Sequence, residues 1–200
     1  MQVMKVDVFR EHRDEYAMPR EPAVVRVGAG RYLTVTGRGA PNSEEFRAKV
    51  GALYGTAYTL KFAWKKRDHD FKVGALEGLW TATGRGKPAL AAPKKTWRWK
   101  LLIRVPGFVT RPSLERALAA LRAKRGPSAD VALETIREGV CVQVLHTGAY
   151  GDEPKTLAKM DAFVKAKRLR YRGPHHEIYL SDPRRVPAAR LRTILRHPVA

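Results

Sequence analysis

Two glutamates stand at similar points of the two halves of this chain, and a carboxylate is a group that can do acid–base chemistry. Glu177 lies in an alternating segment, which places it on one face of a predicted strand together with His175 and Tyr179. Desolvation beside aromatic rings raises the pKa of a carboxylate, and such a group can bind a cation or act as a general base on water. A salt bridge to one of the 39 Lys and Arg side chains is the simpler alternative.

The first half offers a matching carboxylate and a set of aromatic rings. Glu77 lies in the segment Leu76-Glu77-Gly78-Leu79-Trp80, and with Glu177 it predicts two carboxylates across a shared cleft, for acid–base chemistry or cation capture. A surface charge is the alternative for Glu77. Aromatic side chains stack on flat ligands at little entropic cost, although most of them are core residues by default. The candidate ligand-binding residues besides Glu77 are Trp80, Trp99, Tyr54, Tyr58 and His146, while Tyr150, in a turn before a helix, joins Tyr179 as a candidate at the reacting group.

Metal, nucleophile and phosphate-loop chemistry lack matching motifs. The adjacent His175 and His176 point to opposite faces of a strand, and with His146 and Cys141 they fit no zinc spacing. Cys141 and His146 are five residues apart and face opposite sides of their strand, so Cys141 is expected to be a small buried hydrophobe. The segment 84–88 has a proline directly after its lysine and is no phosphate loop. We therefore expect no metal and no cofactor.

Composition predicts a folded, strongly basic protein. The 200 residues carry 39 Lys and Arg against 19 Asp and Glu, a net charge of +20, and 44% are hydrophobic. The basic residues are spread along the chain without a helix-turn-helix or zinc-finger pattern, so we expect no specific nucleic-acid partner. No apolar run reaches the ~18 residues of a membrane span, and the N-terminus lacks a signal-peptide pattern. The expectation is a cytoplasmic monomer or homodimer with a small-molecule ligand.

Hydrophobic periodicity and turn residues predict the elements that position these side chains. They are strands over 23–27 and 32–36, a helix over 42–64, strands within 71–80 and 96–105, a helix over 110–125, strands over 131–136 and 139–147, a helix over 152–167, and strands over 175–181 and 191–196. Asn42 is the expected N-cap of the first helix, with Glu45 completing a capping box. The strand over 96–105 alternates between an apolar face and a solvated face with Arg98, Lys100 and Arg104.

The two halves repeat one order of elements. The segments 39–44 and 148–153 both follow a strand and precede a helix, and each half continues strand, helix, strand, strand. This predicts an α+β fold of duplicated modules with pseudo-twofold symmetry, an antiparallel sheet and a ligand groove between the halves. We expect one domain over 1–200, with an N-terminal arm over 1–22, a first module over 23–106 and a second module over 107–200.

Four segments resemble the GyrI-like small-molecule-binding family, in its stand-alone bacterial branch, and the resemblance covers nearly the whole chain. They are His175–Arg184, Leu145–Pro154, Leu76–Trp80 and Ala57–Phe62. The resemblance implies the two-module fold with a groove between the modules. In drug-sensing transcription activators that share the domain, a buried glutamate near the C-terminus meets lipophilic cations among aromatic rings, and Glu177 is its counterpart by position. Those regulators carry an added DNA-binding domain, which we do not find in this sequence.

Some stand-alone members are implied to be hydrolases that open the strained cyclopropane of DNA-alkylating natural products. By that resemblance Glu177 would activate water, Tyr150 or Tyr179 would donate to or orient the oxygen that becomes negative, and Glu77, Trp80 and Trp99 would line the groove. Two hypotheses follow: a hydrolase of ring-strained xenobiotics, or a non-catalytic module that sequesters or senses amphipathic, often cationic compounds. The net charge of +20 favours a neutral electrophile, because a basic field repels cations.

Overall fold

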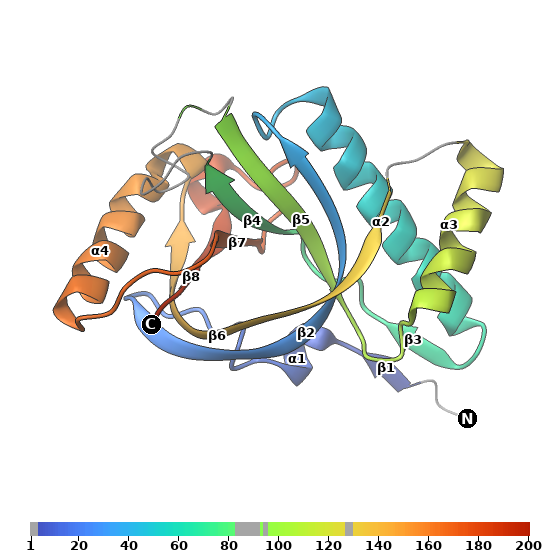
Figure 1. The fold of residues 1–200 in the computed structure, drawn as a ribbon, viewed down its shortest axis with the longest axis horizontal. Helices are drawn as coiled ribbons and strands as arrows, with labels where there is room; N and C mark the ends of the chain where they lie inside the picture. The colour runs from blue at the N-terminus through green and yellow to red at the C-terminus, as the bar shows by residue number, and fades with distance from the viewer. Residues whose placement is uncertain (1–3, 83–92, 94–95, 127–129) are drawn as a thin grey trace.

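Strands of both halves of the chain close into one barrel (Figure 1). The computed structural model describes residues 4–82, 93, 96–126 and 130–200. The barrel strands are β2 (Ala23–Arg38), β4 (Glu77–Ala82), β5 (Trp97–Val105), β6 (Ala132–Thr147), β7 (His175–Tyr179) and β8 (Arg192–Pro198). The helices are α1 (Val8–Glu11), α2 (Glu44–Lys65), α3 (Arg111–Arg125) and α4 (Glu153–Ala166), and short 3-10 turns cover Tyr150–Asp152 and Ala188–Arg190. The short strands β1 (Met4–Val6) and β3 (His69–Phe71) pair in parallel outside the barrel.

The barrel confirms the predicted duplicated α+β fold with an antiparallel sheet. One module runs β2-α2-β4-β5 and the other β6-α4-β7-β8, and around the barrel the order is β2-β5-β4-β7-β8-β6. Equivalent strands meet at both seams, because β2 pairs with β6 and β4 pairs with β7. Every barrel pair is antiparallel. The seam between β4 and β7 therefore joins the two strands that carry the candidate glutamates.

Closure of the sheet changes the burial of one strand face. On β5 the outward face is apolar, as predicted, and packs under α2. The inward face was predicted to be solvated, and this is wrong for Arg104, which is only 2% exposed. Because the sheet closes on itself, its second face lines a barrel interior, and a side chain there needs partners inside the protein.

Several element boundaries differ from the prediction. The strands β2 and β6 each run through 16 residues without the predicted interruptions. The helix α2 begins at Glu44 with Ser43 as its N-cap, where Asn42 was predicted, because the Ser43 hydroxyl accepts a hydrogen bond from the Phe46 amide at 3.1 Å. Glu45 does not close a capping box and instead accepts from Lys49 at 2.7 Å. The segment 71–80 is divided between β3 and β4.

The long helices lie on the outside of the barrel. In Figure 1, α2 and α4 stand on either side of β4 and β7, and α3 packs beside α2. The helix α2 buries Leu53, Ala57 and Leu60 in the larger apolar cluster, which includes the outward residues of β5. The helix α4 buries Met160 and Val164 in a second apolar cluster with residues of β6 and β8. The outward face of β4 and β7 thus lies between two helices. None of the helices in the described part of the chain is long and apolar enough to cross a membrane.

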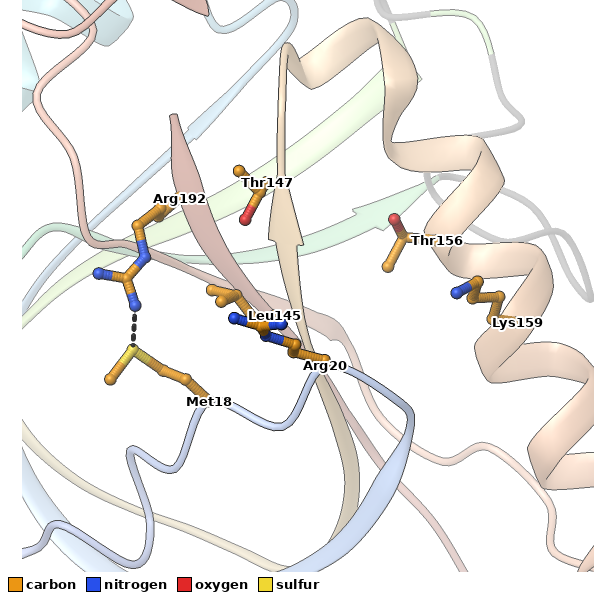
Figure 2. A pocket seen from close by; sticks show the side chains of 7 residues that line it. All are labelled: Met18, Arg20, Leu145, Thr147, Thr156, Lys159 and Arg192. Atoms are coloured by element: carbon orange, nitrogen blue, oxygen red, sulfur yellow. Dashed lines mark hydrogen bonds between the residues drawn. The ribbon is translucent and has the colours of Figure 1, made fainter. Parts of the chain in front are cut away.

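The N-terminal arm is part of the packing of the barrel. Tyr16 is 4% exposed and packs on Ile178 and Ile194. Further along the arm, the Leu145 amide of β6 donates to the Pro19 carbonyl at 2.8 Å, which fixes the arm against the strand. A cavity of about 650 Å³ lies between this part of the arm, the end of β6 and α4 (Figure 2).

Candidate functional site

Glu177 lies at the β4–β7 seam, on the face that points out of the barrel toward the space between α2 and α4. It is 5% exposed. The Tyr179 hydroxyl donates to Glu177 Oε2 at 2.6 Å, and Trp80 Nε1 donates to the same hydroxyl at 3.0 Å. This chain of hydrogen bonds connects both modules and holds the carboxylate in one orientation. His175 completes the group, with Nε2 at 3.5 Å from Glu177 Oε1.

A glycine allows this chain of hydrogen bonds to form. Gly78 is the residue paired with Glu177 across the seam. A Cβ at this position would lie 2.8 Å from Trp80 Nε1 and 3.2 Å from the Tyr179 hydroxyl. Both side chains can therefore close over the backbone of β4 only because position 78 lacks a side chain.

Aromatic rings extend the site away from Glu177. The Trp80 ring packs edge-on against Trp97 at 5.4 Å between centroids and stacks with Phe46 of α2 at 6.1 Å. Phe46 also packs against Trp99, at 5.0 Å. On the side of α4, the Tyr150 ring meets the edge of Tyr179 at 6.0 Å. The carboxylate is thus bordered by rings from both modules.

A second carboxyl group faces Glu177 from the start of α4. Glu153 is the first residue of this helix and is 4% exposed, and its Oε1 has no hydrogen-bond partner among the described residues. Burial, and next the negative charge of Glu177, raise the pKa of Glu153 to about 9. Burial and the charges of the same two glutamates also raise the pKa of Tyr150 to about 12. At neutral pH Glu153 therefore holds its proton and is a carboxylic acid beside Glu177.

The structure brings several of the predicted site residues into one group, and Tyr54 packs against the apolar cluster beside them. Glu177, Tyr179, Tyr150 and Trp80 form one contiguous group, and Phe46 connects it to Trp99. The predicted ligand-binding residues Tyr54 and Tyr58 lie on α2 with their rings stacked at 6.4 Å, and Tyr58 is 47% exposed. His146 is 4% exposed, and its ring lies 2.8 Å from the Thr156 hydroxyl and 3.1 Å from the Ala149 carbonyl oxygen, so it connects β6 to α4.

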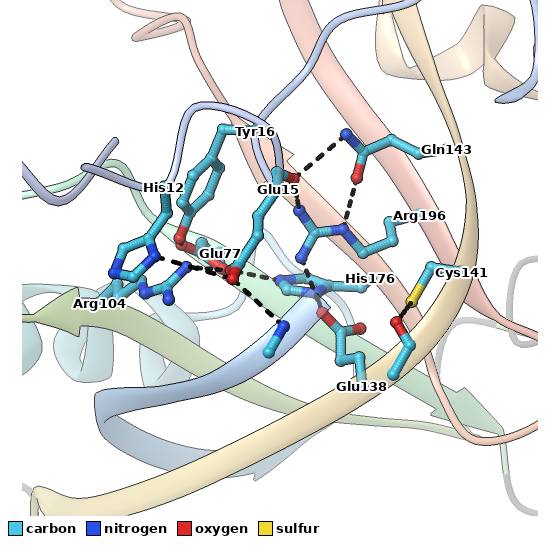
Figure 3. A network of polar contacts seen from close by, with 12 residues as sticks. His12, Glu15, Tyr16, Glu77, Arg104, Glu138, Cys141, Gln143, His176 and Arg196 are labelled. Carbon is cyan, nitrogen blue, oxygen red and sulfur yellow. Dashed lines mark hydrogen bonds and ion pairs between the residues drawn. The ribbon is translucent and has the colours of Figure 1, made fainter. Parts of the chain in front are cut away.

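Glu77 does not meet Glu177 across a cleft. It pairs with Ile178 in the β4–β7 register, so its side chain points into the barrel whereas Glu177 points outward. Inside, Glu77 is fully buried, accepts from the Tyr16 hydroxyl at 2.9 Å and lies 3.0 Å from His176 Nε2 (Figure 3). The second carboxyl group beside Glu177 is Glu153 instead.

The barrel interior holds a network of paired charges around His176. Its Nδ1 lies 3.0 Å from Glu138 Oε2, which also accepts from Arg196 Nη1 at 2.7 Å (Figure 3). Although burial opposes the charged ring, Glu138 and then Glu77 raise the pKa of His176 to about 9. His176 and Arg196 in turn outweigh burial and lower the pKa of Glu138 to about 2. His176, Glu77, Glu138 and Arg196 are thus paired with one another inside the barrel, and their contacts join strands of both modules.

Sequence reasoning missed Glu153 because its position in the chain has an ordinary explanation. A glutamate in the first turn of a helix is favoured by the helix dipole, and Pro154 directly after it marks a helix start. No local signal distinguishes such a residue from one buried against a second carboxylate. In the described part of the chain, no three His, Cys, Asp or Glu side chains gather as ligands of a metal ion would.

The chain matches one family model and is similar to several solved structures. The model described as the GyrI-like small molecule binding domain matches residues 107–200. An uncharacterized conserved protein from Listeria innocua is 37% identical with a TM-score of 0.90, covering 98% of this chain and 100% of that chain. A hydrolase from Listeria innocua is 35% identical with a TM-score of 0.85, and the match again covers 98% of this chain and 100% of that chain.

More distant structures share the fold. The C-terminal domain of EcmrR has a TM-score of 0.60 at 10% identity, covering 90% of this chain and 97% of that domain. No curated protein matches the chain significantly.

Proposed function

The chain belongs to the GyrI-like small-molecule-binding family, and from this premise we propose that it is a hydrolase that opens strained, cyclopropane-containing electrophiles at Glu177 and Glu153. The relative from Listeria innocua described as a hydrolase, at 35% identity, supports an enzymatic role. The observation that carries the proposal is the pair of buried carboxyl groups among aromatic rings, in which burial and Glu177 raise the pKa of Glu153.

Two carboxyl groups in different protonation states can supply a base and an acid in one step. Glu177 accepts a proton from a water molecule as the water oxygen forms a bond to the strained ring carbon. The carbon–carbon bond of the cyclopropane breaks, and its electron pair moves through the conjugated system to a carbonyl oxygen. That oxygen takes the proton of Glu153. The product has gained one water molecule, and transfer of a proton from Glu177 to Glu153 restores the starting state.

Tyr179 is a positioning residue in this mechanism. The Tyr179 hydroxyl donates a hydrogen bond to Glu177 and accepts one from Trp80. It therefore orients the Glu177 carboxylate, and its hydrogen is not available to a substrate. Trp80 and Phe46 provide ring faces against which a flat electrophile can stack. This role replaces proton donation by Tyr179, which the family resemblance implied as one alternative.

The test compares wild type with Glu177→Gln, Glu153→Gln and the exposed control Glu115→Gln on α3. Turnover of a cyclopropane conjugated to a carbonyl group is measured by chromatography, and binding is measured by quenching of tryptophan fluorescence. Loss of one positioned acid or base slows such a step by about 100- to 10,000-fold. We expect this loss for both site variants with binding retained, and full activity for the control. Absence of wild-type turnover on any such electrophile, or full turnover by Glu177→Gln, contradicts the proposal.

A non-catalytic cation-binding module is the second candidate, because a buried carboxylate bordered by aromatic rings is also a suitable site for a lipophilic cation. In the same fluorescence assay, a lipophilic quaternary ammonium compound is titrated into wild type and Glu177→Gln. Binding that is lost in the variant, together with no turnover of electrophiles, favours this candidate. The acid form of Glu153 favours the hydrolase, since a pure cation site has no use for a proton donor.

A further inference from the structure

The cavity between the arm and α4 has a strongly basic lining. Its residues come from four separate segments: Met18 and Arg20 from the arm, Leu145 and Thr147 from β6, Thr156 and Lys159 from α4, and Arg192 from β8. Three of these side chains are cationic and none is acidic. Figure 2 shows the cationic groups around the cavity, with Arg192 and Lys159 on opposite sides.

The cations of this cavity have few partners in the protein. Arg192 Nη2 donates to the sulfur of Met18 at 2.9 Å, and a thioether is a weak, uncharged acceptor. The described residues give the Arg20 side chain no hydrogen bond and no ion pair. Lys159 alone has an acidic partner, Glu21 at 3.0 Å, and this pair is exposed. Three positive charges against one carboxylate leave an excess of two.

The remaining lining residues add hydroxyl groups and an apolar surface. His146 Nε2 faces the Ala149 carbonyl oxygen at 3.1 Å, and its Nδ1 lies 2.8 Å from the Thr156 hydroxyl. The Thr156 hydroxyl is thereby held in place at the cavity wall. Leu145 and Met18 supply apolar contacts beside the cations.

The backbone keeps this arrangement in place. The Leu145 amide donates to the Pro19 carbonyl, so the arm is fixed to β6 between its two lining residues. The position of Arg192 is set by its own amide, which donates to the Ser181 hydroxyl at 3.1 Å. The cations are thus carried by segments that are tied to the barrel.

We propose that this cavity is a second binding site, separate from Glu177, for a small organic phosphate monoester. A monoester carries close to two negative charges at neutral pH, which matches the excess of two in the lining. Guanidinium groups bind phosphate oxygens through charge-assisted hydrogen bonds, and Arg20 and Arg192 are the donors available for this. The organic part of the ligand lies against Leu145 and Met18, which a free phosphate ion would leave uncovered.

Phenyl phosphate is the probe, and its binding is measured by calorimetry at physiological salt. The variants are Arg192→Gln and Arg20→Gln, with Arg116→Gln on the exposed surface of α3 as the matched control. We expect saturable binding that weakens about tenfold in each cavity variant, the effect of one lost charge-assisted hydrogen bond, and stays unchanged in the control. Glu177→Gln should leave this binding unchanged, so the result is independent of the proposed hydrolase activity.

Inorganic phosphate and a short random DNA duplex distinguish the sources of phosphate. The proposal requires phenyl phosphate to bind more tightly than inorganic phosphate, because only the ester covers the apolar wall. It is overturned if no saturable binding is found, if all three arginine variants lose affinity equally, or if inorganic phosphate binds as tightly as the ester. Duplex DNA that binds more tightly than phenyl phosphate and loses affinity in the two cavity variants also overturns it, in favour of a nucleic-acid surface. Circular dichroism of each variant shows whether it is folded.

Discussion

Replacing Glu153 by Gln should make the protein more stable at neutral and basic pH. In the folded protein burial and Glu177 raise the pKa of Glu153 to about 9, against an ordinary value of 4.5. Between these values the folded state holds a proton that the unfolded chain releases, so the free energy of unfolding falls as pH rises. Gln has no proton to lose and removes this dependence.

The size of the effect follows from the number of pH units crossed. Each unit corresponds to about 1.36 kcal/mol, so the advantage of Glu153→Gln over wild type should grow by at most about 2.7 kcal/mol between pH 5 and pH 7. The change with pH is the diagnostic quantity, because replacing the side chain itself alters packing and hydrogen bonding by an amount that does not depend on pH.

Urea denaturation followed by circular dichroism at pH 5, 6, 7 and 8 measures the difference between the two proteins. The exposed control Glu115→Gln should differ from wild type by a constant amount, within about 0.5 kcal/mol. The comparison with wild type also separates Glu153 from His176, whose stabilising contribution is complete below pH 6.5 and is lost as pH rises through about 9. A pH-independent difference for Glu153→Gln, or a loss of stability that grows with pH, would refute the assignment of a protonated Glu153.

Further substitutions test the site, the interior network and the packing of the barrel. Tyr179→Phe removes the hydrogen bond to Glu177 and should lower kcat at least tenfold with little change in substrate binding; an unchanged kcat rules out the positioning role. Glu138→Gln leaves buried cations without their carboxylate and should cost about 3–5 kcal/mol in urea denaturation, whereas a change below 1 kcal/mol contradicts the pairing. Gly37→Ala places a Cβ 2.1 Å from the Trp99 ring and should lower the free energy of unfolding by about 1–3 kcal/mol. Gly51→Ala, with open space around it in α2, should raise the free energy of unfolding by up to about 1 kcal/mol. Equal effects of the two substitutions in urea denaturation would refute this packing.

The sequence predicted the order of elements and the faces of strands because these depend on local periodicity. Alternation alone placed Glu177 and Tyr179 on one face of β7, and the structure joins them at 2.6 Å. The helical stripe of α2 and the repeat of strand, helix, strand, strand were also visible in the sequence. Element boundaries were less predictable, since Asn42 and Ser43 are both good N-caps and only the backbone at Ser43 decides between them.

Whether a strand face meets solvent, and which side chains meet across the molecule, was decided by tertiary structure. Alternation assigns side chains to two faces of a strand but does not show whether the sheet closes into a barrel. Closure buries Arg104 inside the barrel, where Glu77 also lies and accepts a hydrogen bond from Tyr16. The partner of Glu177 is Glu153, 24 residues earlier in the chain, which docking of α4 beside β7 brings near it. Protonation of that glutamate comes from burial and a neighbouring charge, which are properties of three-dimensional position and not of residue type.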